Sequence, residues 1–281
     1  MKTYKNWIIL ITISVFSFSA YTQNKTFSVE VKGSGDPILL IPGFTCTGEV
    51  WKDVVDELSK TNECHIFTLA GFGDVPAIET PWLSTIKSEM VHYINNNDLQ
   101  EATIIGHSLG GTIGLWLAAD ENSEFNKIIV VDALPSTGAL MIPNFDSATL
   151  AYDSPYNQRL LDMDAENFEK MADQMAAGMS LNKEKHNQIK SWIINTDRKT
   201  YVYGYTDLLK LDLRKAIGEI KVPVTILAAT QPYGEVMVKK TYEEQYKNLK
   251  DYTIHYAKES AHFIMFDQPQ WLLEAITNEL L

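Results

Sequence analysis

Short apolar runs recur along the first half of the chain, and stretches with helical spacing separate them. The runs have the length of strands and occupy residues 27–32, 37–42, 64–70, 102–107 and 127–132. The first of them, FSVEVK, alternates as an edge strand does, whereas ILL, CHIFTLA and IIVV are continuous and typical of buried strands. Helical spacing covers residues 51–60, 83–95 and 109–119. Strands that alternate with helices predict a parallel sheet with helices on both faces.

The alternation stops in the middle of the chain and returns near its end. From about residue 135 to 213 there is no clear buried strand, and methionines stand at 141, 163, 171, 175 and 179. Strands return at 222–229 and 252–257, with helices near 239–249 and from about Pro269. Because the sheet resumes, we expect the middle stretch to be a helical cap, inserted between the sixth and seventh strands, and not a separate domain.

The first residues have the pattern of a secretory signal. Lys2 and Lys5 precede the apolar run 7–18, and the small residues Ser19 and Ala20 follow it. The run is short for a transmembrane helix. We predict a signal peptide over residues 1–20, a mature domain over residues 21–281 and a secreted or periplasmic protein without stable membrane insertion. The alternative is an uncleaved membrane anchor.

Composition narrows the class of protein. A chain of 281 residues that is 45% hydrophobic suits one large α/β domain. Its net charge of -12 disfavours nucleic-acid partners and anionic membrane surfaces. Cys46 and Cys64 fall at opposite ends of neighbouring strands, roughly 20 Å apart, whereas a disulfide needs Cα atoms within about 7 Å. We therefore expect two free thiols. The sequence leaves the oligomeric state open.

A nucleophile motif lies between a predicted strand and a predicted helix. Gly106, Ser108 and Gly110 form G-x-S-x-G in the segment IIGHSLGGT. The turn is so sharp that the serine takes a strained backbone conformation, and small residues two positions away let helix and strand pass closely. The amide of Leu109 then starts the helix and points toward developing negative charge. We predict that Ser108 is a nucleophile; the alternative is a turn that serves packing only.

Two further segments supply the partners that this serine needs. In LLIPGFTC, Gly43 lets the backbone turn, so that the amide of Phe44 can serve as the second oxyanion donor. In ESAHFIMFDQPQWL, His262 follows the last strand and precedes a helix that starts near Pro269, which suits a general base. The other histidines fall within predicted strands or helices, and one of them, before the serine, should point away from it: His65, His92, His107, His186 and His255.

The segments GHSLGG, LLIPGF and AHFIMFDQP resemble the α/β-hydrolase fold, and in particular the small single-chain hydrolases with a helical cap. The resemblance covers essentially the whole mature chain. It implies an eight-stranded, mostly parallel sheet, with Ser108 as nucleophile, His262 as base and the Phe44 and Leu109 amides as oxyanion hole. One departure is Pro42, where many relatives have a histidine, and it removes a side-chain hydrogen bond beside the oxyanion loop.

The acid of the triad is the open question. Relatives often carry an aspartate just after the seventh strand, but this chain reads TILAATQPYGEV there, and its first carboxylate is Glu235. Asp132 ends the run IIVV on the strand next to that of Ser108, a position that some branches of the family use. Asp132 is favoured, Glu235 is the alternative, and a third possibility is neither. Asp212, between cap and core, is interpreted as structural.

The resulting expectation is a serine hydrolase that forms an acyl-enzyme on a small to medium apolar ester, thioester or lactone. Its partner is a small-molecule substrate, and no cofactor or metal is expected. A lyase, a cofactor-free peroxidase-like enzyme or a binding protein with little turnover are the alternatives, because the same scaffold hosts them.

Specificity is expected to come from the cap. The residues Phe168, Met171, Met175 and Met179 recur at helical spacing. They either pack the cap on the core or line a flexible acyl pocket. Three tyrosines are candidates for the pocket mouth: Tyr152, Tyr156 and Tyr233.

Overall fold

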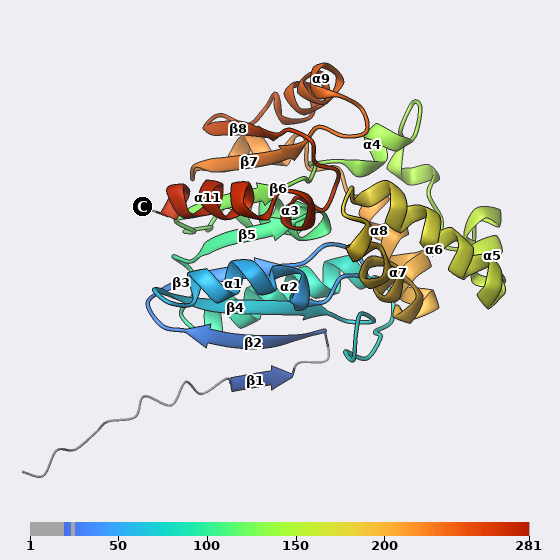
Figure 1. The fold of residues 1–281 in the computed structure, drawn as a ribbon, viewed down its shortest axis with the longest axis horizontal. Coiled ribbons are helices and arrows are strands. Elements are labelled where there is room, and N and C mark those ends of the chain that lie inside the picture. Colours follow the sequence, from blue (N-terminus) through green and yellow to red (C-terminus); the bar gives the residue numbers. More distant parts are fainter. Residues whose placement is uncertain (1–19, 24–25, 281) are drawn as a thin grey trace, which may run out of the picture.

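A single eight-stranded sheet organises the protein (Figure 1). The computed structural model describes residues 20–23 and 26–280. The strands stand in the order β1-β2-β4-β3-β5-β6-β7-β8. The β1–β2 and β2–β4 pairs are antiparallel, and all later pairs in this order, from β4–β3 to β7–β8, are parallel. Their bounds are Ala20–Gln23, Phe27–Gly33, Asp36–Ile41, Asn62–Leu69, Thr103–His107, Lys127–Val131, Val224–Ala229 and Tyr252–Ala257. The predicted mostly parallel, eight-stranded sheet is confirmed.

The predicted signal peptide lies almost wholly outside the described residues, so cleavage and secretion stay predictions. Its last residue, Ala20, is already part of β1 and stands opposite Val31 in β2. Within residues 20–23 and 26–280, no helix is both long and apolar enough to cross a membrane.

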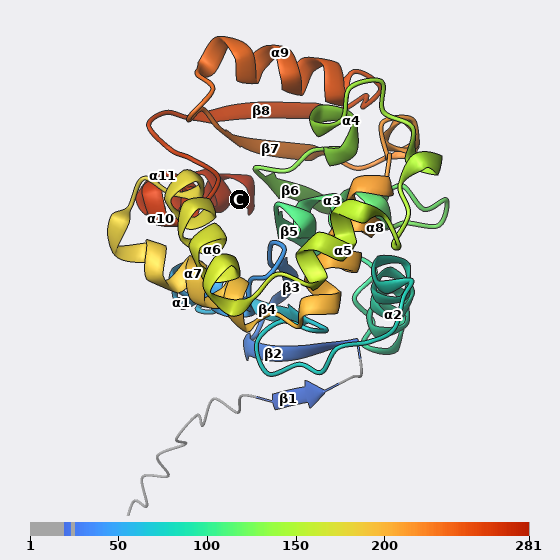
Figure 2. The same ribbon diagram turned by 90° about the vertical axis from the view of Figure 1, so that its right-hand side faces the viewer.

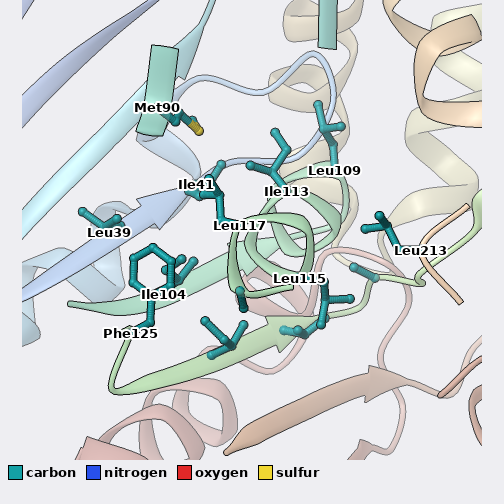
Figure 3. Close-up of a cluster of buried hydrophobic side chains, with 14 of the residues drawn as sticks. Leu39, Ile41, Met90, Ile104, Leu109, Ile113, Leu115, Leu117, Phe125 and Leu213 are labelled. Carbon is teal, nitrogen blue, oxygen red and sulfur yellow. The ribbon is translucent and has the colours of Figure 1, made fainter. Parts of the chain in front are cut away.

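Helices cover both faces of the sheet, as the alternation predicts. On one face lie α1 (Lys52–Leu58) and α11 (Pro269–Leu280), and on the other lie α2 (Trp82–Asn96) and α3 (Leu109–Ala118) (Figure 1). Successive strand residues point to opposite faces, so Ile104 packs against α3 while Ile105 joins the core beneath α1 and α11. Figure 3 shows the first of these cores, in which Ile113 and Leu117 of α3 face Ile104 and Ile41.

The cap stands between β6 and β7, as predicted, and lies across the ends of the strands (Figure 2). Its helices are α4 (Thr137–Met141), α5 (Pro155–Leu161), α6 (Ala165–Met179), α7 (His186–Asn195), a π-helical turn (Thr200–Gly204) and α8 (Tyr205–Lys210). The remaining helices are α9 (Glu235–Tyr246) and α10 (Ile264–Asp267), with 3-10 turns at Gly48–Trp51, Ser147–Thr149, Lys183–Lys185 and Ala216–Glu219.

The buried line of α6 differs in detail from the predicted methionine stripe. It runs through Phe168, Ala172 and Ala176, and the methionines flank it. Met171, Met175 and Met179 are half-buried and pack against the core cluster of this face. Small residues at the centre let the helix approach closely, so packing of the cap on the core accounts for most of the stripe.

The helix predicted near 239–249 begins earlier, at Glu235, and ends at Tyr246. Gly234 precedes it with a φ of 80°, a conformation that favours glycine and lets the chain turn from the β7 loop into the helix. The shift matters because it fixes the direction of Glu235 and of the tyrosines that follow.

Both cysteines are buried and free. Cys64 lies in β4 beside Ile38, near the start of β3, whereas Cys46 follows the other end of β3. The strand separates them, as the sequence predicted.

The start of α3 presses directly on the sheet. A Cβ added to Gly110 would lie 2.1 Å from the carbonyl oxygen of Ile41, and one added to Gly106 would lie 2.3 Å from the carbonyl of Gly110. No side chain fits at either position, so these two glycines are required by the approach of α3 to β3 and β5.

We therefore expect Gly110→Ala to lower the free energy of unfolding by about 3 kcal/mol or to prevent folding, because backbone must shift to admit the methyl group. The matched control is Gly178→Ala on α6, where nothing lies within 4 Å of the added Cβ. That variant should gain about 1 kcal/mol from helix propensity. Denaturant unfolding of both variants measures the contrast, and equal stabilities would contradict the close approach.

Candidate active site

Ser108 stands at the turn between β5 and α3 in a strained backbone conformation. Its φ is 51° and its ψ is -120°, values that few residues other than glycine adopt. The surroundings hold the strain: the Ser108 amide donates to the Val131 carbonyl at 2.9 Å, and the Ser108 carbonyl accepts from the Thr112 amide at 3.0 Å. The side chain stays partly accessible at the end of the sheet. This is the geometry that the G-x-S-x-G spacing predicts.

The predicted oxyanion loop lies against this serine. A Cβ added to Gly43 would come within 3.3 Å of the Ser108 Cβ, so the loop after β3 touches the turn. The Cys46 amide closes this loop onto the Gly43 carbonyl at 3.1 Å. Leu109 is the first residue of α3, so its amide has no acceptor inside the helix. The amides of Phe44 and Leu109 therefore belong to the two segments that meet at Ser108.

The ring of Phe44 is fixed by aromatic neighbours from both the core and the cap. Phe72 and Trp82 meet it edge-on at centroid distances of 5.2 and 6.0 Å. From the cap, Tyr201 and Tyr205 lie at 5.9 and 5.4 Å. The predicted oxyanion loop is thus held in place by packing of the Phe44 side chain.

The structure brings the predicted base and the favoured acid together. His262 lies in the loop between β8 and α10, and its Nδ1 donates to Oδ2 of Asp132 at 2.7 Å. Asp132 directly follows β6 with a φ of 45°, which turns its side chain toward the histidine. Glu235, the alternative acid, pairs instead with Lys239 at 2.6 Å and Lys258 at 3.9 Å. Of the two candidates, Asp132 is the one at the histidine.

The second oxygen of Asp132 is held just as firmly. Oδ1 accepts the Ala229 amide and the Tyr242 hydroxyl, both at 2.8 Å. Burial alone would raise the pKa of Asp132, but its hydrogen bonds with His262, Ala229 and Tyr242, together with the attraction to His262, outweigh burial and hold the pKa below its usual value. Ala229 ends β7, so this strand contributes an amide to the carboxylate of Asp132.

His107 contacts the base, which corrects the expectation that it points away from the site. Its Nε2 lies 3.0 Å from the His262 carbonyl oxygen and therefore carries the donated proton. The two imidazole rings lie 4.6 Å apart, and Trp51 and Phe263 pack against the ring of His107. Burial, reinforced by the positive charge that His262 can carry, lowers the pKa of His107 to about 3. His107 is therefore a neutral support for the loop of His262.

The loop that carries His262 is also fastened to the cap. Asp267 accepts the Ala261 amide at 2.8 Å, and it accepts three donors from the end of α6 at 2.6, 2.9 and 3.1 Å. Those donors are the Ser180 hydroxyl and the amides of Leu181 and Asn182. In addition, the Phe263 amide donates to the Met179 carbonyl at 3.0 Å. The position of the base thus depends on the position of α6.

The two methionines predicted to contact the substrate lie in different parts of the protein. Met175 lies near the oxyanion loop, because its sulfur accepts the hydroxyl of Tyr201 at 3.3 Å and Tyr201 contacts Phe44. Met171 lines a hollow of about 700 Å³ between α5 and α6, together with residues such as Arg159 and Asn167. A second hollow, of about 660 Å³, lies between α1, α7 and α11. Neither hollow is lined by Ser108 or His262. The candidate site is therefore identified by the arrangement of its reactive side chains and not by the size of a hollow.

The three tyrosines predicted for the pocket mouth differ in exposure and in hydrogen bonding. Tyr233 is 74% exposed in the loop between β7 and α9, and Tyr156 is 60% exposed on α5. Tyr152 donates its hydroxyl to Asp207, which ties the segment before α5 to α8. Its role is structural, whereas Tyr233 stays a prediction at the rim. Asp212 pairs with Arg214 at 2.6 Å, in agreement with the structural interpretation.

The Tyr242 hydroxyl and the amide of Ala229 are the site groups that sequence reasoning missed. Tyr242 and Tyr246 are four residues apart in a predicted helix, which places them on one face. That spacing signals a buried aromatic face, but it contains no sign that the face covers a carboxylate.

Comparison with known proteins agrees with the fold and with the geometry of the turn. The profile of the Alpha/beta hydrolase family matches residues 38–275, most of the chain. The protein belongs to this family. The predicted resemblance is confirmed for this α/β hydrolase.

Among sequence relatives, a pimeloyl-[acyl-carrier protein] methyl ester esterase from Aeromonas hydrophila is 23% identical over 266 residues, which cover 89% of this chain and 98% of that protein. A biotin biosynthesis bifunctional protein from Cellvibrio japonicus is 23% identical over 244 residues. The match covers 86% of this chain and 47% of that protein, so this α/β hydrolase spans about half of the bifunctional relative.

Solved structures share the architecture at low sequence identity. The enol-lactonase from Burkholderia xenovorans has a TM-score of 0.77 at 16% identity, with 93% of this chain and 99% of that one covered. An esterase from Exiguobacterium antarcticum has a TM-score of 0.74 at 15% identity, with coverage of 93% and 99%. At this identity the likeness shows a common fold.

The buried neutral His107 should make the stability of this α/β hydrolase depend on pH. In the unfolded chain a histidine binds a proton below its ordinary pKa of 6.5, whereas native His107 does so only near 3. The contribution of neutral His107 to the free energy of unfolding is therefore fully present above pH 6.5. It is lost as the pH falls from 6.5 toward 3, and the loss is about 2 kcal/mol at pH 5.

His107→Gln keeps an amide donor for the His262 carbonyl but does not titrate. Denaturant unfolding at pH 7.5 and pH 5.0 should show that wild type loses about 2 kcal/mol more than the variant. The remaining histidines are present in both proteins, so their contributions cancel in the comparison. The same pH dependence in both proteins would mean that His107 is accessible to protons in the folded state.

Proposed function

We propose that this α/β hydrolase is a serine esterase that cleaves a carboxylic ester-like bond of a small to medium apolar substrate through an acyl-enzyme. The observation that carries the proposal is the 2.7 Å hydrogen bond between His262 and Asp132, in a chain whose strained turn presents Ser108 at the same edge of the sheet. The names of the relatives support it, since they include methyl ester esterases, an esterase and an enol-lactonase.

In the proposed reaction, Oγ of Ser108 attacks the ester carbonyl carbon while Nε2 of His262 takes the hydroxyl proton. The amides of Phe44 and Leu109 stabilise the oxyanion. The carbon–oxygen bond to the alcohol then breaks, and His262 returns the proton to the departing alkoxide. A water molecule next attacks the acyl-enzyme, gives its proton to His262 and releases the acid, and Ser108 recovers its proton.

Asp132 gives the histidine its orientation and its charge balance in this scheme. Because Nδ1 of His262 is held by the carboxylate, Nε2 is left free to accept the serine proton. The low pKa of Asp132 keeps the carboxylate ionised, so it stabilises the imidazolium that forms during attack.

The substrate's apolar part is proposed to lie beside Phe44, under the π-helical turn of the cap. Tyr201 and Tyr205 flank this ring, and their hydroxyls donate to sulfurs of Met175 and Met141 at 3.3 and 3.2 Å. Thioether sulfur is a weak acceptor and methionine is flexible, so both pairs can rearrange around a substrate. These contacts favour an apolar ester, thioester or lactone. The predicted signal sequence supports a secreted or periplasmic location.

The decisive test compares Ser108→Ala, Asp132→Asn and Glu235→Gln with wild type in hydrolysis of p-nitrophenyl butyrate. Ser108→Ala should abolish the acyl-enzyme pathway. Asp132→Asn should lower kcat by about 10⁴-fold, because an amide cannot stabilise the imidazolium or select the tautomer. Glu235→Gln should stay within about twofold, because Glu235 is a solvated partner of Lys239.

Circular dichroism and denaturant unfolding establish that the variants are folded. The proposal fails if wild type does not hydrolyse acyl esters of any chain length, or if Ser108→Ala retains the wild-type rate. Near-normal turnover by Asp132→Asn would leave the nucleophile in place but remove the carboxylate from the mechanism.

The proposed pocket predicts a change of chain-length preference. Met175→Ala removes side-chain volume beside Tyr201, so kcat/KM for an octanoate ester should rise about tenfold relative to the butyrate ester. Met171→Ala is the matched control on the same helix, because Met171 faces the hollow between α5 and α6. Equal effects of the two substitutions would place the acyl chain somewhere other than beside Phe44.

A further inference from the structure

One face of α9 is bonded to the segment that follows β6. The hydroxyls of Tyr242 and Tyr246 each donate at 2.8 Å, the first to Oδ1 of Asp132 and the second to the carbonyl of Ala133. The amide of Gln245 bonds to both the carbonyl and the N–H of Ser136, at 3.1 and 3.2 Å. All three α9 side chains are buried. The helix therefore holds the start of the cap and the carboxylate of the triad at once.

We propose that Tyr242 is a positioning residue of the triad, whose hydroxyl holds Oδ1 of Asp132 and thereby sets how strongly Oδ2 binds the imidazole of His262. The inference rests on the proposed function, because it concerns the same histidine. It extends that function because it assigns the adjustment of the His262 pKa to a side chain on α9.

The physical reason is the division of charge between the two carboxylate oxygens. A donor at Oδ1 stabilises the carboxylate in its own right and so weakens its pull on the proton at Nδ1 of His262. Tyr242 is buried, so solvent does not replace its hydroxyl when it is removed. The Ala229 amide still holds Oδ1 at 2.8 Å and keeps the carboxylate in place. Without the phenol, more of the negative charge faces His262, and its imidazolium becomes more stable.

The matched control is the neighbouring tyrosine on the same face. The rings of Tyr242 and Tyr246 are stacked at 5.9 Å with an interplanar angle of 8°. Both are buried, and each hydroxyl makes a hydrogen bond of the same length. They differ in the acceptor, which is a carboxylate oxygen for Tyr242 and a backbone carbonyl for Tyr246. A merely structural role predicts equal effects from removal of either hydroxyl.

The other titratable groups near this network are accounted for. On the β5 side, His107 contacts His262 and stays neutral because burial lowers its pKa to about 3. On α9 and β8, burial raises the pKa values of Tyr246 and Tyr256, so both phenols are neutral near pH 7. On α10, the carboxylate of Asp267 accepts hydrogen bonds from the Ala261 amide and from the Ser180 hydroxyl at the end of α6. Substitution at Tyr242 leaves all of these groups in place, and substitution at Tyr246 removes only its own neutral phenol.

The experiment measures the pKa of His262 directly by NMR, from the pH dependence of its imidazole Cε1–H signal. Wild type, Tyr242→Phe and Tyr246→Phe are compared, and a His262→Gln variant assigns the signal. We expect the pKa of His262 to rise by about half a unit to one unit in Tyr242→Phe and to change by less than about 0.2 in Tyr246→Phe. An unchanged or lowered pKa in Tyr242→Phe, or equal shifts in both variants, overturns the proposal.

Substitution of 3-fluorotyrosine for Tyr242 supplies a test of opposite sign that preserves the hydroxyl. Fluorine makes the phenol a stronger donor, so the pKa of His262 should fall. This measurement also tests the role of Tyr242 if Tyr242→Phe does not fold. A rise or no change overturns the proposal.

A kinetic arm links the shift to turnover of p-nitrophenyl butyrate. The acid limb of kcat/KM should move to higher pH in Tyr242→Phe by the same amount as the NMR pKa, with KM unchanged. It should not move in Tyr246→Phe. If wild type does not hydrolyse esters, the proposed function fails, while the NMR comparison still decides the role of Tyr242.

Discussion

Parallel strand pairing is the constraint on which the site depends. In a parallel sheet the carboxyl ends of neighbouring strands meet at one edge, and here β3, β5, β6 and β7 end side by side. Each strand end contributes one element: the predicted oxyanion loop, a strained serine, a carboxylate and an amide that holds the carboxylate. The register of the sheet fixes the separation of these groups, so strand pairing alone brings segments that are distant in sequence close together. Helices on both faces make that register rigid, because a shift by one residue would exchange the two buried faces.

Much of this arrangement could be predicted from the sequence because the relevant signals are local. A strand, a G-x-S-x-G turn and an apolar helix are contiguous, and so are the last strand, the loop of His262 and the helix that starts at Pro269. The acid was harder, since Asp132 and Glu235 both satisfy the order along the chain. Distance decides between them, and distance is a property of the folded sheet. The direction of Glu235 depends on Gly234, whose positive φ starts α9 earlier than the apolar pattern indicates.

The contacts that could not be predicted join segments far apart in the sequence. Tyr242 reaches Asp132 across 110 positions, and His107 reaches the His262 carbonyl across 155. Neither residue is unusual in its local context: one belongs to an aromatic helix face, and the other precedes a serine. In α6 the periodicity correctly indicated a packed face. The choice between methionine and alanine as its buried line depended on how closely the cap approaches the core, which the sequence pattern does not contain.

The attachment of Asp267 to the end of α6 has a consequence for traffic through the site. A cap that is tethered to the base at one end cannot lift there as a free lid, because the histidine would move with it and lose its alignment. A substrate would therefore pass by the opposite flank, where α4 and α5 carry the exposed side chains of Leu140, Met141 and Tyr156. Through Asp267, the attachment of the cap and the position of the predicted base become a single constraint.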